Sequence, residues 1–322
     1  MHRSVSHGST GGTRWQADRM ALLPFDLPPA LQAYAARGDD WGRWVAGLPR
    51  LVRELIDEWE LTVDGDPLHG HTALVVPVVA AGERLVLKVV MPHEEARHEA
   101  LALQHWHGRG AVRLVRADPR RDAMLLERLQ TRDLGSVPVL QACSVVAGLL
   151  GRLHVPAPAQ LVPLTAFVSR WTDDLAALPR GAPLPRRVVE QAVHLGRAFV
   201  GDDASVGRLV HGDLHYGNVL AGDRSPWLAI DPKPVSGDPH YEIAPLLWNR
   251  WDEIVASGDL RTAIRRRFHT VVDDAGLDED RARDWVVVRE AIRAMWAIQD
   301  GEPGAVTGAV TAAITIVKAV QD

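Results

Sequence analysis

The spacing of apolar residues changes near residue 129, and this change constrains the fold more than any other feature. Before it, apolar and β-branched residues form short runs separated by turn-forming residues, as in consecutive antiparallel strands. The runs occupy residues 61–63, 73–79, 84–90, 112–116 and 123–129. Beyond residue 129, apolar residues recur every three or four positions, as in long helices. The pattern predicts an α+β fold in which a five-stranded part precedes a mainly helical part.

This division predicts an N-terminal lobe over residues 1–128 and a C-terminal lobe over residues 129–322. Residues 1–13 are polar and rich in Gly, Ser and His, and we expect them to be disordered. An amphipathic helical pattern over residues 41–60 contains Pro49, which is expected to break it into two helices. A further helix is predicted over residues 94–107, within the strand-rich lobe.

Composition argues against several classes of protein. The formal net charge of -5 argues against a nucleic-acid-binding surface, which requires a clustered basic excess. Cys143 is the only cysteine, so the chain has no disulfide framework, as is common in a reducing cytoplasm. The weakly charged stretch 304–317 is shorter than the roughly 20 apolar residues that span a bilayer, and it predicts a buried terminal helix. We expect a cytoplasmic monomer without nucleic-acid or membrane partners.

One polar segment interrupts the helical part and carries the strongest chemical signal. It contains His211-Gly-Asp-Leu-His-Tyr-Gly-Asn218, followed by Ala229-Ile-Asp231 at the end of the next apolar run. Phosphoryl transfer to an alcohol requires an acceptor for the hydroxyl proton and oxygen ligands for Mg²⁺ bound to nucleotide phosphates. Asp213, Asn218 and Asp231 supply these groups in order, so the segment predicts a kinase.

This segment resembles the catalytic core of the protein-kinase-like superfamily, in its aminoglycoside phosphotransferase branch, where glycine replaces the arginine of the protein-kinase loop. The resemblance implies a two-lobed protein-kinase-like fold with ATP and Mg²⁺ as cofactors. It also implies that Asp213 orients the acceptor hydroxyl and accepts its proton. By the same match Asn218 and Asp231 hold Mg²⁺, and His211 braces the loop.

The resemblance also implies a lysine on the third strand of the N-terminal lobe, and Lys88 occupies that position in Leu-Val-Leu-Lys-Val-Val. In such kinases this lysine contacts the α- and β-phosphates and is held by a glutamate on the following helix. Glu99 is the first candidate for that glutamate, and Glu95, one turn earlier, is the alternative. Without the downstream segment, a solvent-facing lysine on an edge strand would be the commoner interpretation of Lys88.

The remaining nucleotide contacts are expected from the turn before the predicted strand at residues 73–79 and from the junction of the lobes. Gly70 lies at a strand-to-strand tip and, with Thr72, is predicted to present backbone N–H groups and a hydroxyl to phosphate. An ordinary hairpin turn explains Gly70 equally well. The segment Met124-Leu-Leu-Glu-Arg-Leu129 falls at the junction, so the backbone of Glu127 and Leu129 is predicted to contact adenine.

Within that branch, the sequence is similar to the streptomycin 6-phosphotransferase and hydroxyurea-resistance kinase family. The likeness runs from about residue 41 to the C-terminus. It rests on Trp44-Val-Ala-Gly-Leu-Pro49, Met124–Leu129, Asp213–Asn218 and Trp227-Leu-Ala-Ile-Asp-Pro-Lys-Pro234. It implies phosphorylation of a hydroxyl of the streptidine ring at the 6-position, and so antibiotic resistance. Phosphorylation of another small metabolite or of hydroxyurea is the alternative.

A cationic acceptor requires acidic side chains in the helical lobe. Asp238, Glu242 and Asp252 follow Asp231 closely enough to line the cleft and meet guanidinium or ammonium groups. A solvated surface position is the competing interpretation of each residue. His215 is predicted to contact the acceptor or to substitute for the loop lysine of protein kinases, and a structural hydrogen bond within its loop is the alternative.

Two functions of other classes compete with the kinase. The polar segment offers potential ligands for a two-metal phosphohydrolase: His211, Asp213, His215, Asn218, Asp231 and His240. That interpretation leaves Lys88 and its helix without a role. A non-catalytic nucleotide-binding protein of the same fold is the second rival, although such proteins usually lose one of the polar groups that are all present here.

Overall fold

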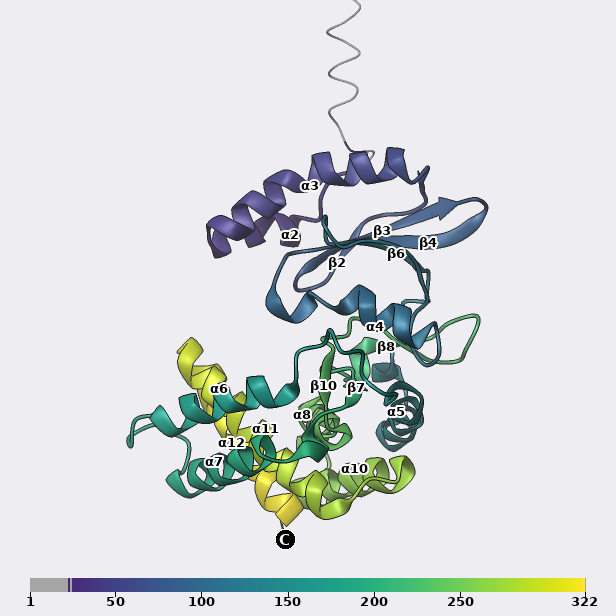
Figure 1. The fold of residues 1–322 in the computed structure, drawn as a ribbon. Helices are drawn as coiled ribbons and strands as arrows, with labels where there is room; N and C mark the ends of the chain where they lie inside the picture. The colour runs from purple at the N-terminus through teal and green to yellow at the C-terminus, as the bar shows by residue number, and fades with distance from the viewer. Residues whose placement is uncertain (1–22, 24, 322) are drawn as a thin grey trace, which may run out of the picture. The chain divides into compact units, whose positions relative to one another are not determined.

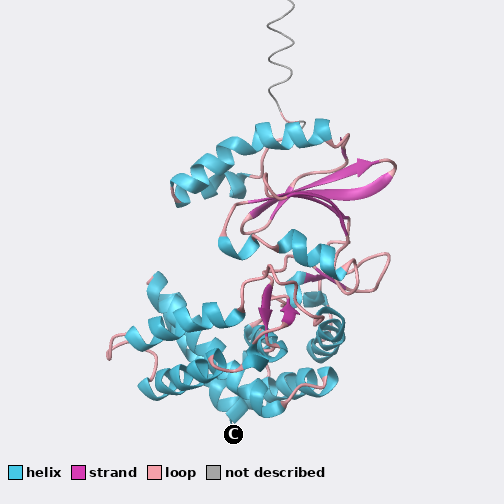
Figure 2. Cartoon of the chain, viewed as in Figure 1, coloured by secondary structure: helices cyan, strands magenta, loops and turns pink. Residues whose placement is uncertain are grey.

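The structure, a computed structural model, describes Leu23 and residues 25–321. The expectation that residues 1–13 are disordered lies outside this range. The chain divides into two compact units (Figures 1 and 2). The first comprises the chain up to His93 together with Leu114–Arg128, and the second comprises Glu94–Arg113 and the chain from Leu129 onward. Residues 94–113, which we assigned to the N-terminal lobe, are therefore grouped with the helical unit.

The first unit contains a six-stranded antiparallel sheet, one strand more than predicted. Its strands are β1 (Thr62–Val63), β2 (Leu68–His69), β3 (Ala73–Ala80), β4 (Glu83–Val90), β5 (Leu114–Asp118) and β6 (Ala123–Glu127). The order is β1-β3-β4-β6-β5, and β2 pairs with β3 beside β1. The additional strand is β2, which lies in a segment that sequence alone indicated as a turn, because two residues are too few to show an alternating pattern.

One long helix, α3 (Asp39–Glu58), packs on this sheet after the short helices α2 (Pro29–Ala33) and η1 (Tyr34–Arg37) (Figure 1). The prediction that Pro49 divides the helical pattern is wrong, because α3 is continuous through it. Leu48, Val52 and Leu55 are buried on one face of α3, within the cluster that includes alternate residues of β3 and β4. Burial of this face offsets the loss of about 3 kcal/mol expected for a proline inside a helix.

The second unit is mainly helical and includes two short antiparallel strand pairs (Figure 2). Its helices are α4 (Glu99–Trp106), α5 (Val139–Leu153), α6 (Leu164–Ala177), α7 (Arg186–Val200), α8 (Ala244–Trp248), α9 (Trp251–Ala256), α10 (Leu260–Ala275), α11 (Glu279–Asp300) and α12 (Pro303–Gln321). The strand pairs are β7 (Arg208–Val210) with β10 (Val235–Gly237), and β8 (Val219–Leu220) with β9 (Leu228–Ala229). The predicted helix over 94–107 is split into the 3₁₀ turn η2 (Glu94–Ala96) and α4.

The C-terminal helix is α12. Within the described range it is the one helix whose length and apolar composition would allow it to cross a membrane. Length and composition do not separate a spanning helix from a core helix, and in this structure Val310, Ala313 and Val317 belong to the same buried cluster as Ala291 and Met295 of α11. This packing fits the predicted buried terminal helix.

Candidate active site

The polar segment folds into two neighbouring loops, because the strands that flank one loop pair with the strands that flank the other. The first loop joins β7 to β8 and the second joins β9 to β10. Val210 of β7 pairs with Val235 of β10, and Val219 of β8 pairs with Ala229 of β9. These two pairings bring together residues 211–218 and 230–234, which carry the predicted Asp213, Asn218 and Asp231.

Backbone and side-chain hydrogen bonds connect the two loops. The Ile230 N–H donates to the Asn218 carbonyl oxygen at 2.9 Å. The side-chain amide of Asn218 donates through Nδ2 to the backbone oxygen of Asp213 at 2.8 Å. This bond uses the amide nitrogen, so the amide oxygen is the atom with which Asn218 could bind a cation. Asp231 has a φ of 56°, an uncommon left-handed conformation for a residue other than glycine.

His211 is fully buried at the start of the first loop and links this loop to the second. Its Nε2 lies 2.9 Å from the Ile230 oxygen, and its Nδ1 accepts the Asp213 N–H at 3.3 Å. Burial lowers the pKa of His211 despite the nearby carboxylates of Glu242 and Asp213, which favours the neutral ring. A neutral ring with the proton on Nε2 satisfies both contacts. His211 therefore connects the two loops, and both ring nitrogens are already used within the protein.

Gly212 is required at its position by the close approach of the second loop. Its φ is +83°, and a Cβ at this position would lie 2.1 Å from the carbonyl oxygen of Lys233. The Lys233 N–H in turn donates to the His211 oxygen at 2.8 Å. Position 212, where the protein-kinase loop has an arginine, therefore accepts only glycine in this structure.

The side chain of Asp213 is about a quarter exposed and forms an ion pair that sequence reasoning missed. Lys233 Nζ lies 2.9 Å from Asp213 Oδ2 and 3.7 Å from Glu95 Oε2. Burial lowers the pKa of Lys233, but the carboxylates of Asp213 and Glu95 outweigh this effect and the pKa is raised overall. The available sequence signal was the position of Lys233 between Pro232 and Pro234, two residues after Asp231.

The donor set of Asn218 and Asp231 fits Mg²⁺, which binds proteins through one or two carboxylate or carbonyl oxygens and completes its shell with water and phosphate oxygens. A two-metal hydrolase would require a denser cluster. Within residues 25–321, no group of three or more His, Cys, Asp or Glu side chains is placed to hold a metal ion. His240, part of the hypothetical hydrolase cluster, is hydrogen-bonded to Asp238 instead.

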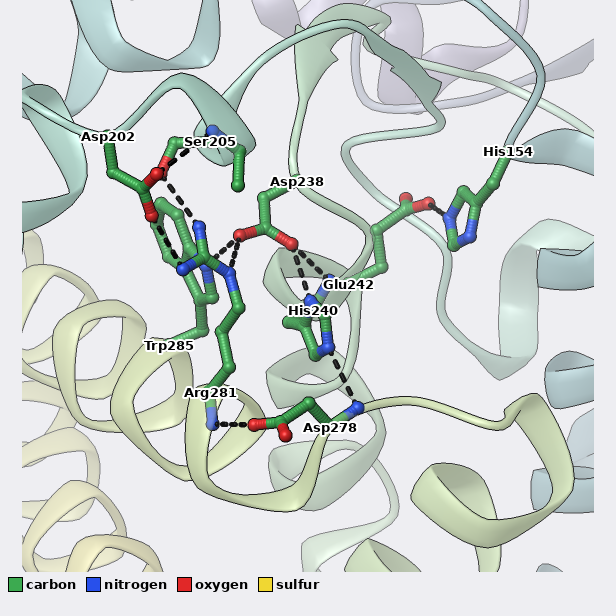
Figure 3. A network of polar contacts seen from close by, with 10 residues as sticks. His154, Asp202, Ser205, Asp238, His240, Glu242, Asp278, Arg281 and Trp285 are labelled. Atoms are coloured by element: carbon green, nitrogen blue, oxygen red, sulfur yellow. Dashed lines mark hydrogen bonds and ion pairs between the residues drawn. The ribbon is translucent and has the colours of Figure 1, made fainter.

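Two of the predicted acceptor-binding carboxylates have structural roles, which corrects their assignment. Asp238 is fully buried, and its two oxygens bind His240, Arg281 and Trp285 (Figure 3). Burial would raise the pKa of Asp238, but the hydrogen bonds from His240 and Trp285 hold it below its ordinary value. A carboxylate enclosed and paired in this way cannot meet a substrate without breaking its existing bonds.

Glu242 is the second corrected residue and is also fully buried. Its Oε1 accepts the Gly212 N–H at 2.8 Å. Its Oε2 lies 2.7 Å from His154 Nε2 (Figure 3). Burial acts to raise the pKa of Glu242, but the contact with His154 and the Gly212 N–H lower it overall. The residue that we expected to bind the acceptor therefore fixes the backbone next to Asp213.

The other two predicted acceptor residues lie in different surroundings. Asp252 is exposed on α9 and does not line the cavity beside Asp213. His215 is half-buried and caps the 3₁₀ helix η5 (Tyr216–Asn218), where its Nδ1 accepts the Gly217 N–H at 3.1 Å. This contact matches the structural alternative for His215.

A cavity of about 180 Å³ lies beside Asp213 in the second unit. Its walls are rich in aromatic side chains: Phe167, Trp171, Tyr241, Trp248 and Trp296. Its charged lining residues are Glu94, Glu95, Asp213, Lys233, Arg289 and Arg293. Neither the two glutamates nor the tryptophans were predicted to line the acceptor site, because their positions on separate helices give no local signal. A larger hollow of about 760 Å³ between α5 and α10 contains none of the predicted site residues.

The predicted nucleotide-contacting residues of the first unit lie on and beside its sheet. Lys88 is buried near the middle of β4, opposite Val75 of β3 and Met124 of β6, so it is not on an edge strand. Gly70 donates its N–H to the Ala73 oxygen at 2.9 Å, and the Thr72 oxygen accepts the Met91 N–H at 2.7 Å. A Cβ on Gly70 would meet no atom within 4 Å, so packing within the protein does not require glycine there.

Three predicted residues lie at the ends of elements. Glu127 ends β6 opposite Leu85 and is half-buried, and Leu129 is half-buried just beyond it. Glu99 begins α4 and is almost fully buried. Lys88 belongs to the first unit and Glu99 to the second, and their contact stays a prediction.

Comparisons with known proteins agree with the chemistry of this site. A family model described as aminoglycoside/hydroxyurea antibiotic resistance kinase matches residues 58–301. The chain is 43% identical to a streptomycin 6-kinase from Streptomyces glaucescens, over 88% of this chain and 95% of that protein. It is 41% identical to a hydroxyurea phosphotransferase from Kitasatospora aureofaciens, over 80% of this chain and 76% of that protein.

Solved structures resemble the fold. A thermostable mutant of an aminoglycoside phosphotransferase, in complex with ADP and hygromycin B, superposes with a TM-score of 0.58 at 18% identity, covering 83% of this chain and 97% of that chain. A choline kinase from Streptococcus pneumoniae gives a TM-score of 0.55 at 15% identity, covering 84% of this chain and 98% of that chain. The predicted α+β, protein-kinase-like fold is confirmed.

Proposed function

Because the chain belongs to the aminoglycoside/hydroxyurea antibiotic resistance kinase family, we propose that it transfers the γ-phosphoryl group of ATP to the 6-hydroxyl of streptomycin and so confers resistance. The observation that carries this proposal is the position of Asp213 on the wall of an aromatic cavity, with Asn218 bonded to its backbone and Asp231 on the adjoining loop. The 43% sequence identity to a streptomycin 6-kinase, which extends over 95% of that protein, supports the choice of acceptor.

In the proposed reaction, the Asp213 carboxylate orients the acceptor hydroxyl and accepts its proton as the new O–P bond forms and ADP leaves. Asn218 and Asp231 hold Mg²⁺, which neutralises charge on the nucleotide phosphates when it is bound. Glu242 accepts the Gly212 N–H and His211 accepts the Asp213 N–H, so both hold the backbone next to the Asp213 carboxylate. This restraint reduces the conformational entropy that the loop loses when the carboxylate binds the acceptor hydroxyl. Lys88, with Glu99, is assigned to the α- and β-phosphates, and Gly70, Thr72, Glu127 and Leu129 to the rest of the nucleotide.

The aromatic cavity suits an acceptor that carries planar cations. The rings of Phe167 and Trp171 lie 5.5 Å apart, and those of Trp171 and Trp296 lie 5.3 Å apart, forming a continuous aromatic wall. Guanidinium groups stack on such rings and pair with carboxylates, which Glu94 and Glu95 supply in the same cavity. These residues replace Asp238, Glu242 and Asp252 in the assignment of the acceptor site.

The test is incubation of the protein with labelled ATP, Mg²⁺ and streptomycin, with other aminoglycosides and hydroxyurea as parallel acceptors. We expect a product heavier than streptomycin by one phosphoryl group, located by mass spectrometry at the 6-position, and no product when EDTA removes Mg²⁺. Hydroxyurea is the second candidate acceptor because of the 41% identity to a hydroxyurea phosphotransferase. Release of phosphate from simple phosphate esters without ATP would instead support the hydrolase.

The role of Asp213 has its own variant. Asp213→Asn should lower kcat for streptomycin by about 10³-fold or more while the KM for ATP changes little, since the change removes the proton acceptor and leaves the residues assigned to the nucleotide in place. The matched control is Asp280→Asn, whose carboxylate is 92% exposed on α11 and should leave both constants unchanged. Wild-type kcat in Asp213→Asn would contradict the assignment.

We further propose that the enzyme acts as a cytoplasmic monomer. Light scattering of the purified protein would test its monomeric state.

A further inference from the structure

We propose that Lys233 is a positioning residue for phosphoryl transfer, which holds the Asp213 carboxylate by one oxygen so that the other faces the acceptor. This inference rests on the proposed kinase function. It adds to that function a residue from the second loop, two positions after Asp231 and outside the loop that carries Asp213.

The contact itself is close and directed. Lys233 Nζ lies 2.9 Å from Oδ2 of Asp213, and both side chains line the aromatic cavity. The ammonium thus engages Oδ2, and Oδ1 is the oxygen through which the carboxylate would accept the hydroxyl proton. In the transfer step the acceptor O–H bond breaks as its oxygen bonds to the γ-phosphorus, and the bond from that phosphorus to ADP breaks. A fixed carboxylate lowers the entropic part of this barrier.

The backbone of Lys233 is held more firmly than a surface lysine requires. Pro232 and Pro234 on either side restrict φ at both neighbouring positions. The Lys233 N–H donates to the His211 oxygen, and its carbonyl occupies the space that a Cβ on Gly212 would need. The loop that carries Asp213 and the loop that carries Lys233 are therefore locked together at residues directly beside both side chains.

A second carboxylate also lies near the ammonium of Lys233. Glu95, on η2, lies 3.7 Å from Lys233 Nζ, and its side chain is half exposed. The two other cations of the cavity have different partners: Arg293 binds Glu290 at 2.7 Å, and Arg289 donates to the Tyr241 oxygen at 3.0 Å. Among these three cations, Lys233 is the one that contacts Asp213.

The experiment compares Lys233→Met and Lys233→Arg with wild type, using streptomycin and Mg-ATP, and repeats Lys233→Met in an Asp213→Asn background. Lys318→Met, at an exposed position near the C-terminus of α12, is the matched control. For each protein kcat, both KM values and the midpoint of thermal unfolding are measured. Single-turnover reactions with labelled ATP extend the measurable range of rates for the Asp213→Asn proteins.

We expect Lys233→Met to lower kcat roughly 10- to 100-fold with little change in the KM for ATP, as when the partner that orients a catalytic group is lost. Lys233→Arg keeps the charge and should retain kcat within about tenfold of wild type. In the Asp213→Asn background Lys233→Met should lower kcat less than about threefold, because residues that act through one another are not additive.

Three results would overturn the inference. They are an unchanged kcat in Lys233→Met, a full second loss of kcat in the Asp213→Asn background, or a folded Lys233→Arg without activity. If Lys233→Met fails to fold, Lys233→Arg decides the question alone. A wild-type enzyme that phosphorylates neither streptomycin nor any other acceptor would instead refute the proposed function, and the same assay shows this separately.

Discussion

Replacement of Glu242 by glutamine tests whether a buried carboxylate fixes the catalytic loop. Glu242 is fully buried, and its two oxygens accept from Gly212 N and contact His154 at 2.8 and 2.7 Å. Glutamine keeps one oxygen for Gly212 and places its NH₂ group against Nε2 of His154. The His154 ring can accept this hydrogen bond only in the neutral tautomer that carries its proton on Nδ1. The change therefore exchanges charge-assisted hydrogen bonds for neutral ones.

The magnitude follows from that exchange. A hydrogen bond to a charged group contributes about 1.5–3 kcal/mol and a neutral one about 1 kcal/mol, so with two bonds exchanged Glu242→Gln should destabilise the protein by about 1–4 kcal/mol. For a unit of this size, that corresponds to a decrease in the unfolding midpoint of about 2–16 °C. Glu242→Ala leaves both partners unpaired in the interior and should lower stability by about 3–5 kcal/mol.

The assay is thermal unfolding at pH 7 followed by circular dichroism, together with kcat for streptomycin. Glu190→Gln is the matched control, because Glu190 forms an exposed pair with Arg186 on α7 in the same unit and should change stability by less than about 0.5 kcal/mol. We also expect kcat to fall in Glu242→Gln, since the backbone beside Asp213 loses its anchor. Equal unfolding midpoints for the Glu242→Gln and Glu190→Gln proteins would refute the reasoning.

Two further predictions concern the same loop. The folded state holds the pKa of Glu242 below its ordinary value of 4.5, so its stabilising contribution is present above that pH and is lost as the pH falls through the folded pKa. The difference in unfolding midpoint between wild type and Glu242→Gln should therefore narrow below pH 4.5, and a gap that widens there would contradict the assignment. Gly212→Ala should destabilise the protein by at least about 1–2 kcal/mol and reduce kcat, because alanine disfavours the positive φ and its Cβ meets the Lys233 oxygen. Gly148→Ala, in an open position on α5, should be neutral or stabilising in the same denaturation assay, and equal stability of the two variants would count against the steric argument.

Local patterns in the sequence predicted most of the fold. The alternation of strands and turns predicted five of the six strands in the first unit, because side-chain period is set by backbone geometry within a few residues. The prediction that Pro49 interrupts the helix was wrong, because the local sequence pattern carries no information about tertiary burial. The apolar face of α3 is buried on the sheet, and this tertiary burial keeps the helix intact through the proline.

The candidate site divides in the same way. The order and spacing of Asp213, Asn218 and Asp231 could be interpreted directly, since loops that bind phosphate and Mg²⁺ need these oxygens in sequence. Lys233 was missed although it lies two residues after Asp231. Its significance depends on the pairing of β7 with β10, which places its side chain against Asp213.

The acidic residues of the helical unit mark the limit of sequence reasoning. Asp238 and Glu242 carry the same charge and lie on the same segment as a substrate-binding residue would, so composition and spacing could not separate the two roles. Their partners Arg281 and His154 are 43 and 88 residues away in the chain. The sequence by itself determined the elements and the chemical groups of the catalytic loop, because both depend on neighbours along the chain. Only the tertiary structure decided which carboxylates are enclosed and paired and which side chains form the cavity, because burial and charge pairing depend on residues that meet through folding.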